Sequence, residues 1–507
     1  AEKILSACIK LKQNNPDELL ADLYLQLAQN YLRQHKTENA HKYFALANKI
    51  YINVYGDKNT HSVEAVLGLS DCYLQKEDFK TAYSYAHLAF DKTTQNNKII
   101  LPYDHWECLL RAIACKKELL SQNLITQPDI KSDIENIKHI IAEATLIKQT
   151  YYSTGSQLYY AEKMTELNQL GIYFLTHFYK KTDTYFLDNL LFFAENSKAN
   201  LLRNRIINYK AEEILPLSEK AKSSAITGRL NYFISLNENQ EATPFNINDS
   251  ILFYQNLYET FSKSIEKKYP KIYRLKYGEV PLSARQIQKQ LPKDYTLLEY
   301  CNDGTTYYCL AVSKNHITYK ICGNKHRVDS LIATNQQLIT NKHYNTGISH
   351  QLFKILLPQS LHENLLVSAD GRIYDVPFDA LSSNREQPDY VLYKHPIQYV
   401  FSAGTYFNHQ PPVENKRIIG FYPDFINSPY AVLNNSEEHD ALKLFSNYNV
   451  YHKQNAVKEN FIAQCNTSGI IHIASHLITD TLSPLKSFLV FQPDNSNYSL
   501  SINEIWK

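Results

Sequence analysis

The sequence lacks the charge bias and the long apolar runs that mark nucleic-acid-binding and membrane proteins. Its 507 residues include 53 Lys and Arg against 51 Asp and Glu, a formal charge of +2 at pH 7. This balance gives no electrostatic driving force for binding nucleic acid or an anionic membrane surface. No run approaches the roughly 18–20 apolar residues of a membrane span, and no signal peptide opens the sequence. We therefore expect no membrane and no direct nucleic-acid partner.

The sequence also lacks closely spaced cysteine motifs and has almost no methionine. The eight cysteines show no C-x-x-C pair and no His/Cys metal spacing, so we expect reduced core residues of a cytoplasmic protein, with no metal and no other cofactor. They stand at positions 8, 72, 108, 115, 301, 309, 322 and 465. The only methionine is Met164, and the last residues, "SINEIWK", form neither a turn nor a tail. We expect both ends to be cuts in a longer protein.

The N-terminal part contains an internal repeat. At an offset of 42, Tyr24, Leu27, Ala28, Tyr31, Ala40 and Ala47 align with Val66, Leu69, Ser70, Tyr73, Ala82 and Ala89. This order of large, small and aromatic residues resembles the packing pattern of tetratricopeptide repeats (TPR), with the surplus over the usual period in "IYINVYGDKNTH". Residues 167–206 again predict helix–turn–helix. We expect an all-α TPR solenoid over residues 1–215 that binds a protein or peptide regulator; the alternative is a purely structural spacer.

A helical connector follows at residues 216–285, where the helical pattern continues without the repeat. It includes one long amphipathic helix, "DSILFYQNLYETFSKSIEKKYPKIYRL", which Pro270 is expected to end.

From residue 286 the hydrophobic period becomes that of strands. The predicted strands are "YTLLEYC", "TYYCLAVS", "HITYKIC", "ENLLVSA", "IQYVFSA", "KRIIGFY" and "GIIHIAS". Helical segments stand between several of them, so we expect an α/β domain at 286–507 with a largely parallel sheet. Functional residues in such sheets gather at the carboxyl ends of the strands. His476 directly follows the last strand, at that position.

Two histidines in this stretch, His472 and His476, form H-x-x-x-H, which on a helix would suggest zinc. On a strand the two residues are about 13 Å apart, at ~3.3 Å per residue, which a single metal ion cannot bridge. We interpret His472 as a hydrogen-bonded core residue. For His476 the alternative to a catalytic role is a loop histidine without function.

Several segments, in fixed order, resemble the CHAT family of caspase-like cysteine peptidases, which are usually fused to TPR. The most recognisable is "LLVSADGRIYDVPFDALSS", residues 365–383. "LPKDYTLLEYCNDGTTYYCLAVS" precedes it, and "IQYVFSAGTYF", "RIIGFYPDF", "LNNSEEHDALKLF" and "AVKENFIAQCNTSGIIHIASH" follow it. The resemblance covers about residues 280–507.

The resemblance implies a cysteine endopeptidase of the caspase and separase type, with His476 as the catalytic base. In the family, the nucleophilic cysteine follows this histidine at the end of the next parallel strand. No cysteine follows His476 here, and Cys465 precedes it, so we expect the nucleophile beyond Lys507. Many relatives carry glycine where this sequence has Leu477.

The resemblance also suggests a substrate-binding role for Asp424, at the end of "RIIGFYPDF", where an acid would favour Arg or Lys before the scissile bond. The alternative is a solvated loop carboxylate. The resemblance further implies cleavage of a dedicated protein substrate, after activation sensed through the TPR region, in bacterial defence or cell death. The alternatives are an inactive CHAT-fold scaffold that binds a partner through its TPR, and a peptide-binding adaptor unrelated to peptidases.

Overall fold

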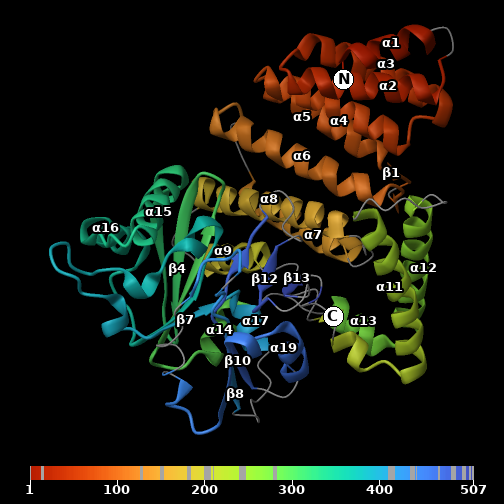
Figure 1. The fold of residues 1–507 in the computed structure, drawn as a ribbon. Coiled ribbons are helices and arrows are strands. Elements are labelled where there is room, and N and C mark those ends of the chain that lie inside the picture. Colours follow the sequence, from red (N-terminus) through yellow and green to blue (C-terminus); the bar gives the residue numbers. More distant parts are fainter. Residues whose placement is uncertain are drawn as a thin grey trace. The chain divides into compact units, whose positions relative to one another are not determined.

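The computed structural model (Figure 1) describes residues 2–12, 16–96, 98–125, 129–148, 154–179, 184–198, 207–208, 210–238, 247–277, 282–408, 417–426, 428–433, 440, 442–465, 469–480, 487–493, 498–501 and 504. The chain forms two compact units, residues 1–407 and 408–507. Among the described residues, no helix combines the length and the apolar character needed to cross a bilayer.

The first unit opens with helices that pair along the chain. They are α1 (Glu2–Lys12), α2 (Glu18–Arg33), α3 (Thr37–Tyr55), α4 (Thr60–Gln75) and α5 (Phe79–Lys92). Helices α2 and α4, and also α3 and α5, begin 42 residues apart, in agreement with the repeat in the sequence. The side chains of Asp17 and Asn59, also 42 apart, cap the amino ends of α2 and α4. The small residues of the pattern, such as Ala40 and Ala82, are fully buried. The assignment to the TPR type stays a prediction.

The helical part continues to residue 290. Its further elements are the short hairpin β1 (Thr94–Gln95) and β2 (Lys98–Ile99), and the helices α6 (Pro102–Ser121), α7 (Ile130–Lys148), α8 (Thr154–Phe178), α9 (Thr184–Ser197), α11 (Leu217–Glu238), α12 (Ile247–Lys268), α13 (Pro270–Tyr277) and α14 (Ala284–Gln290). Pro270 begins α13, so the long amphipathic helix ends just before it, as the sequence predicts. The domain limits expected at residues 215 and 285 remain predictions.

A five-stranded sheet follows in the same unit, in the order β5-β4-β3-β6-β7. Its strands are β3 (Tyr295–Asn302), β4 (Thr306–Ser313), β5 (Ile317–Asn324), β6 (Asn364–Ser368) and β7 (Ile397–Val400), with α15 (Lys325–Thr340) and α16 (Thr346–Leu356) between β5 and β6. The expected largely parallel sheet is only partly correct. Strands β3, β6 and β7 are parallel, but β3, β4 and β5 form antiparallel pairs. Their three-residue turns are too short for a parallel crossover.

The second unit contains two small sheets. Strands β8 (Ile418–Tyr422), β9 (Tyr448–His452) and β10 (Ile470–Ile473) are parallel, in the order β10-β8-β9. Strands β11 (Leu477–Ile478), β12 (Phe488–Val490) and β13 (Ser499–Ser501) are antiparallel, and α19 (Lys458–Gln464) precedes β10. The sequence patterns missed β9 and β11–β13. A helix was also predicted for "SEEHDALKLFSNY", residues 436–448. Residues 436–439 and 441 lie outside the described residues, but residues 443–447 form turns and bends and Tyr448 begins β9, so the carboxyl half of this prediction was wrong.

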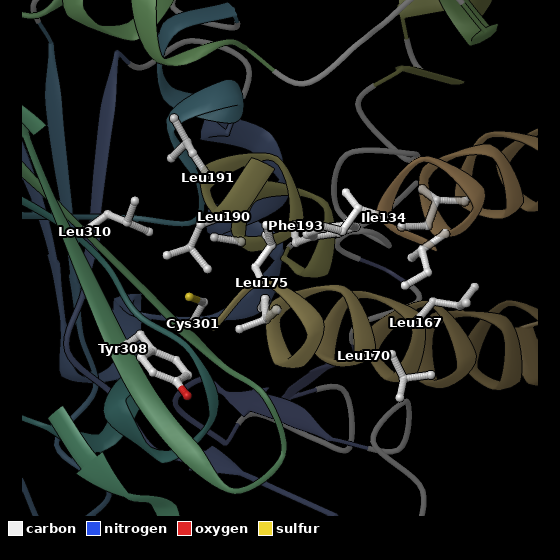
Figure 2. Close-up of a cluster of buried hydrophobic side chains, with 14 of the residues drawn as sticks. Ile134, Leu167, Leu170, Leu175, Leu190, Leu191, Phe193, Cys301, Tyr308 and Leu310 are labelled. Atoms are coloured by element: carbon white, nitrogen blue, oxygen red, sulfur yellow. The ribbon is translucent and has the colours of Figure 1, made fainter. Parts of the chain in front are cut away.

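One hydrophobic core joins the later helices to the five-stranded sheet. Figure 2 shows part of this core, with side chains from α7, α8 and α9 and from β3 and β4. They include Ile134, Leu167, Leu170, Leu175, Leu190, Leu191 and Phe193 from the helices and Cys301, Tyr308 and Leu310 from the strands. Because the two sets of side chains share this core, α8 and α9 form a layer over the sheet.

A buried ion pair lies at the end of α9. The ammonium group of Lys198 donates to Glu299 on β3, and also to the carbonyl and hydroxyl oxygens of Ser368, both at 3.0 Å. Both charged side chains are almost completely inaccessible to solvent. Burial raises the pKa of Glu299 to about 8 against the opposing effect of Lys198. Nearby, Glu195 accepts from the backbone N–H groups of Ala403 and Gly404, both at 2.7 Å, at the start of α17 (Ala403–Asn408). Polar groups of α9 therefore fix the carboxyl ends of the parallel strands.

We predict that Lys198→Met destabilises the protein by about 3–5 kcal/mol at pH 9, because it leaves the Glu299 carboxylate buried without its cation. Without Lys198, the folded-state pKa of Glu299 rises further. Below this raised pKa, Glu299 of the variant is neutral and its burial costs little. The variant loses stability as the pH rises through the folded-state pKa, because the buried carboxylate must then ionise. Denaturant unfolding should show a smaller stability difference from the wild type at pH 6 than at pH 9.

Two further variants serve as controls for this prediction. Adding Glu299→Gln should recover most of the loss at pH 9. Lys325→Met, which breaks the more exposed pair with Asp329 on α15, should cost less than about 1 kcal/mol. A pH-independent loss in Lys198→Met would contradict the electrostatic account.

Candidate functional site

His476 lies three residues beyond the last residue of β10, at the carboxyl end of the three parallel strands. It occupies the last position of the short loop between β10 and β11, and its side chain is half-buried. Its own carbonyl accepts a hydrogen bond of 2.9 Å from Val490 of β12. The backbone of His476 is therefore held by an antiparallel strand, while its imidazole lies at the edge where functional residues of parallel sheets gather.

The imidazole of His476 is oriented by a backbone carbonyl and two aromatic rings. Its Nε2 atom lies 2.7 Å from the carbonyl oxygen of Ala431. Because a carbonyl can only accept, Nε2 carries the proton, and in the neutral ring Nδ1 keeps its lone pair. The rings of Phe425 and Tyr430 lie 4.8 and 6.0 Å from the imidazole, centroid to centroid. The ring is therefore fixed in a tautomer that can accept a proton at Nδ1.

These groups come from the loop after β8, which Gln492 holds in place. The Oε1 atom of Gln492 accepts from the backbone N–H groups of Asp424 and Phe425, both at 3.1 Å. Phe425 is fully buried and has a φ of +59°, an uncommon conformation for a residue other than glycine. Leu433 donates back to the carbonyl of Asp424 at 3.3 Å. Sequence reasoning missed this support, because it consists of backbone atoms and of a glutamine outside any recognisable motif.

Asp424 lies at the end of β8, where the sequence places it, and is half-buried. Its carboxylate accepts from the backbone N–H of Ile426 at 3.2 Å, an interaction within its own turn. Its substrate-binding role stays a prediction.

His472 is hydrogen-bonded, as expected, but it is not a core residue. Its side chain is exposed, and its Nδ1 lies 2.9 Å from the hydroxyl of Tyr422 on β8. The expectation of a core position was wrong because, in the described part of the chain, β10 pairs on one side only, with β8. No group of three or more His, Cys, Asp or Glu side chains that could hold a metal ion occurs in the described part of the chain.

The segment 365–383 fixes the loop after β6. Asp370 accepts from the side chain of Asn302 at 2.7 Å. Gly371 has a φ of +54°, and a Cβ atom there would meet the Tyr307 hydroxyl at 2.6 Å. Phe378 is fully buried, and its N–H donates to the Tyr399 hydroxyl at 3.0 Å. The sequence motif therefore has a structural explanation.

Residues 340–507 match the family model of the CHAT domain. The match begins at the end of α15 and covers α16, β6–β13 and His476. Strands β3–β5 lie outside the matched residues. The N-terminal region is helical and consistent with a repeat solenoid. No curated protein matches the sequence.

Most of the cysteines are structural by their surroundings. Six of the eight are buried: Cys72, Cys108, Cys115, Cys301, Cys309 and Cys322. Burial raises the thiol pKa of all six, for example to about 11 at Cys115 and to about 12 at Cys322. Buried thiols that stay protonated are poor nucleophiles. Cys465, at the end of α19, donates its S–H to the carbonyl of Ile462 at 3.2 Å.

We predict that Gly371→Ala destabilises the protein by about 1–3 kcal/mol, because alanine is strained at positive φ and its Cβ would contact the Tyr307 hydroxyl. The control is Gly228→Ala in α11, where nothing lies within 4 Å of the added carbon. In that helix the same change should stabilise by up to ~1 kcal/mol. Thermal unfolding of both variants measures the difference, and equal effects would contradict the explanation of the motif.

We predict that Gln492→Ala loosens the loop that orients His476, because two buried N–H groups lose their acceptor at a cost of about 1–3 kcal/mol. Hydrogen exchange of peptides covering residues 424–433 should become faster, while exchange in β3 and β4 stays unchanged. Gln454→Ala, at an exposed position of the same unit, is the matched control and should leave the loop unaffected. Unchanged exchange in Gln492→Ala would show that the loop does not depend on Gln492.

Proposed function

We propose that this protein is a cysteine endopeptidase of the caspase and separase type, with His476 as general base. The observation that carries the proposal is the imidazole at the carboxyl edge of parallel strands in the CHAT domain, with Nε2 bonded to Ala431 and Nδ1 able to accept a proton. In this role Nδ1 takes the proton of a cysteine thiol and later returns it to the leaving amine. The reaction is acyl transfer from a peptide bond to sulfur, followed by hydrolysis.

The nucleophilic thiol of this proposal comes from outside the 507 residues. The six buried cysteines stay protonated, and the other two, Cys8 and Cys465, precede His476, against the order of the family. A cysteine at the end of a strand parallel to β10 would face the imidazole. Backbone N–H groups near the strand ends, including that of Leu477, would stabilise the oxyanion.

The substrate is a dedicated protein, and the helical region senses the activating signal by binding a protein or peptide regulator. In this proposal Asp424 favours a basic residue before the scissile bond, and the setting is bacterial defence or cell death in the cytoplasm. The second candidate is a scaffold that keeps the CHAT fold without activity. This second candidate is supported by the six buried thiols, because thiols that stay protonated are poor nucleophiles.

We predict that His476→Ala lowers the cleavage rate of the full-length protein at least ~100-fold, because a general base typically contributes 10²–10⁴. The assay is mass spectrometry of new protein N-termini after adding the full-length protein, with its regulator, to a lysate. His472→Ala is the matched control. Its imidazole is four residues away, exposed and hydrogen-bonded to the Tyr422 hydroxyl, so cleavage should persist.

Equal cleavage by the wild type and by His476→Ala would exclude His476 as the base. Absence of new N-termini under every condition with the wild type would favour the scaffold.

A further inference from the structure

Helices α11 and α12 pack side by side (Figure 1). On one face, Ile265 of α12 packs in a small core with Ile272 of α13 and with Ala211 and Leu215. The other face of α12 is exposed. The inference concerns this second face and is independent of the proposed peptidase activity.

The exposed face of α12 carries a stripe of side chains spaced three or four residues apart. The stripe consists of Asp249, Phe253, Leu257, Thr260, Ser264 and Lys267. This spacing places all six on one side of the helix. Phe253 is 61% exposed and Leu257 39%. Large apolar side chains gathered on one face of a solvated helix indicate a macromolecular interface.

The same face contains a hollow farther along α12, lined in part by Leu257, Thr260 and Ser264 of the stripe. Its volume is about 410 Å³, and small side chains, Ala225 of α11 and Thr260 and Ser264 of α12, contribute to its lining. Phe253 and Ser264 are eleven residues apart, about 16 Å along the helix at 1.5 Å per residue. A protruding ring and a hollow on one surface are the elements of a self-complementary, two-fold interface.

The charges of the stripe are also self-complementary. Asp249 stands at its amino end and Lys267 at its carboxyl end. At the carboxyl end, Lys222 and Lys268 both pair with Glu219, at 3.4 and 2.7 Å, so this end carries excess positive charge. A second copy arranged antiparallel would bring an acid to each basic end.

We propose that the stripe on α12 pairs with the same stripe of a second copy of this chain, antiparallel about a two-fold axis. In this arrangement Phe253 enters the hollow beside Ser264 of the second copy, and Leu257 packs on its Thr260. Asp249 meets Lys267 at both ends of the interface, since antiparallel helices juxtapose residues equidistant from the axis. The connector is then the dimerisation element of the protein.

The test is sedimentation velocity of the wild-type chain over a concentration series, together with two charge reversals. The wild type should dimerise. Asp249→Lys and Lys267→Asp should each weaken self-association at least tenfold, because each creates like-charge contacts at both ends. An equimolar mixture of the two variants should form a heterodimer, because both ends then regain opposite charges.

Two further variants make the test specific. Phe253→Ala should weaken the dimer at least tenfold by removing the ring from the hollow. Asp91→Lys, an acid-to-lysine change at an exposed position of α5, should leave it unchanged. A monomeric wild type at concentrations on the order of 100 μM would overturn the proposal. So would a dimer that persists in Phe253→Ala, or variants that fail to associate when mixed.

Discussion

The hydrogen bond from His476 Nε2 to the carbonyl of Ala431 is the interaction on which the functional account depends. It decides which nitrogen of the ring carries the proton and which can act as a base. The bond requires two segments far apart in the sequence to meet, the loop after β8 and the loop after β10. Parallel pairing of β8 with β10 brings their carboxyl ends together, and Gln492 holds the first loop at its start. The site is therefore built mainly from backbone geometry.

In the larger unit, too, the carboxyl ends of strands are held by segments that are distant in the sequence. Helices α8 and α9 cover the five-stranded sheet and share its core. Lys198 and Glu195, at the end of α9, bind β3, the end of β6 and the start of α17. A buried ion pair contributes little net stability, but it strongly penalises arrangements that separate its members. The pair between Lys198 and Glu299 therefore fixes the position of α9 on the sheet more than it adds to stability.

Much of this fold could be predicted from the sequence, because long apolar runs with clear turns mark their elements directly. All seven predicted strands are present, and the starts of α2–α5 follow the repeat. The error about sheet direction was avoidable. The turn "NDGT" after β3 is a hairpin signal, and two such short turns exclude parallel crossovers within β3–β5. Strands β9 and β11–β13 were missed, because β9 is polar and half-exposed and the others have only two or three residues.

The site was less predictable than the fold, for a physical reason. His476 could be found because its position after an apolar strand is visible in the sequence. The carbonyl of Ala431 has no signature in residue types, since every residue carries one. The exposure of His472 depends on the order of the strands in the assembled sheet. Residue types along one strand do not specify this order. The acidity of Glu299 depends on burial beneath α9, about one hundred positions away in the sequence.

The central claim is that His476 presents an unprotonated Nδ1. Nitrogen-15 NMR of histidine-labelled protein, at a pH where the ring is neutral, reads the tautomer directly, and His476→Ala assigns the signal. The account predicts a proton on Nε2 and a lone pair on Nδ1. A ring protonated on Nδ1 would contradict it.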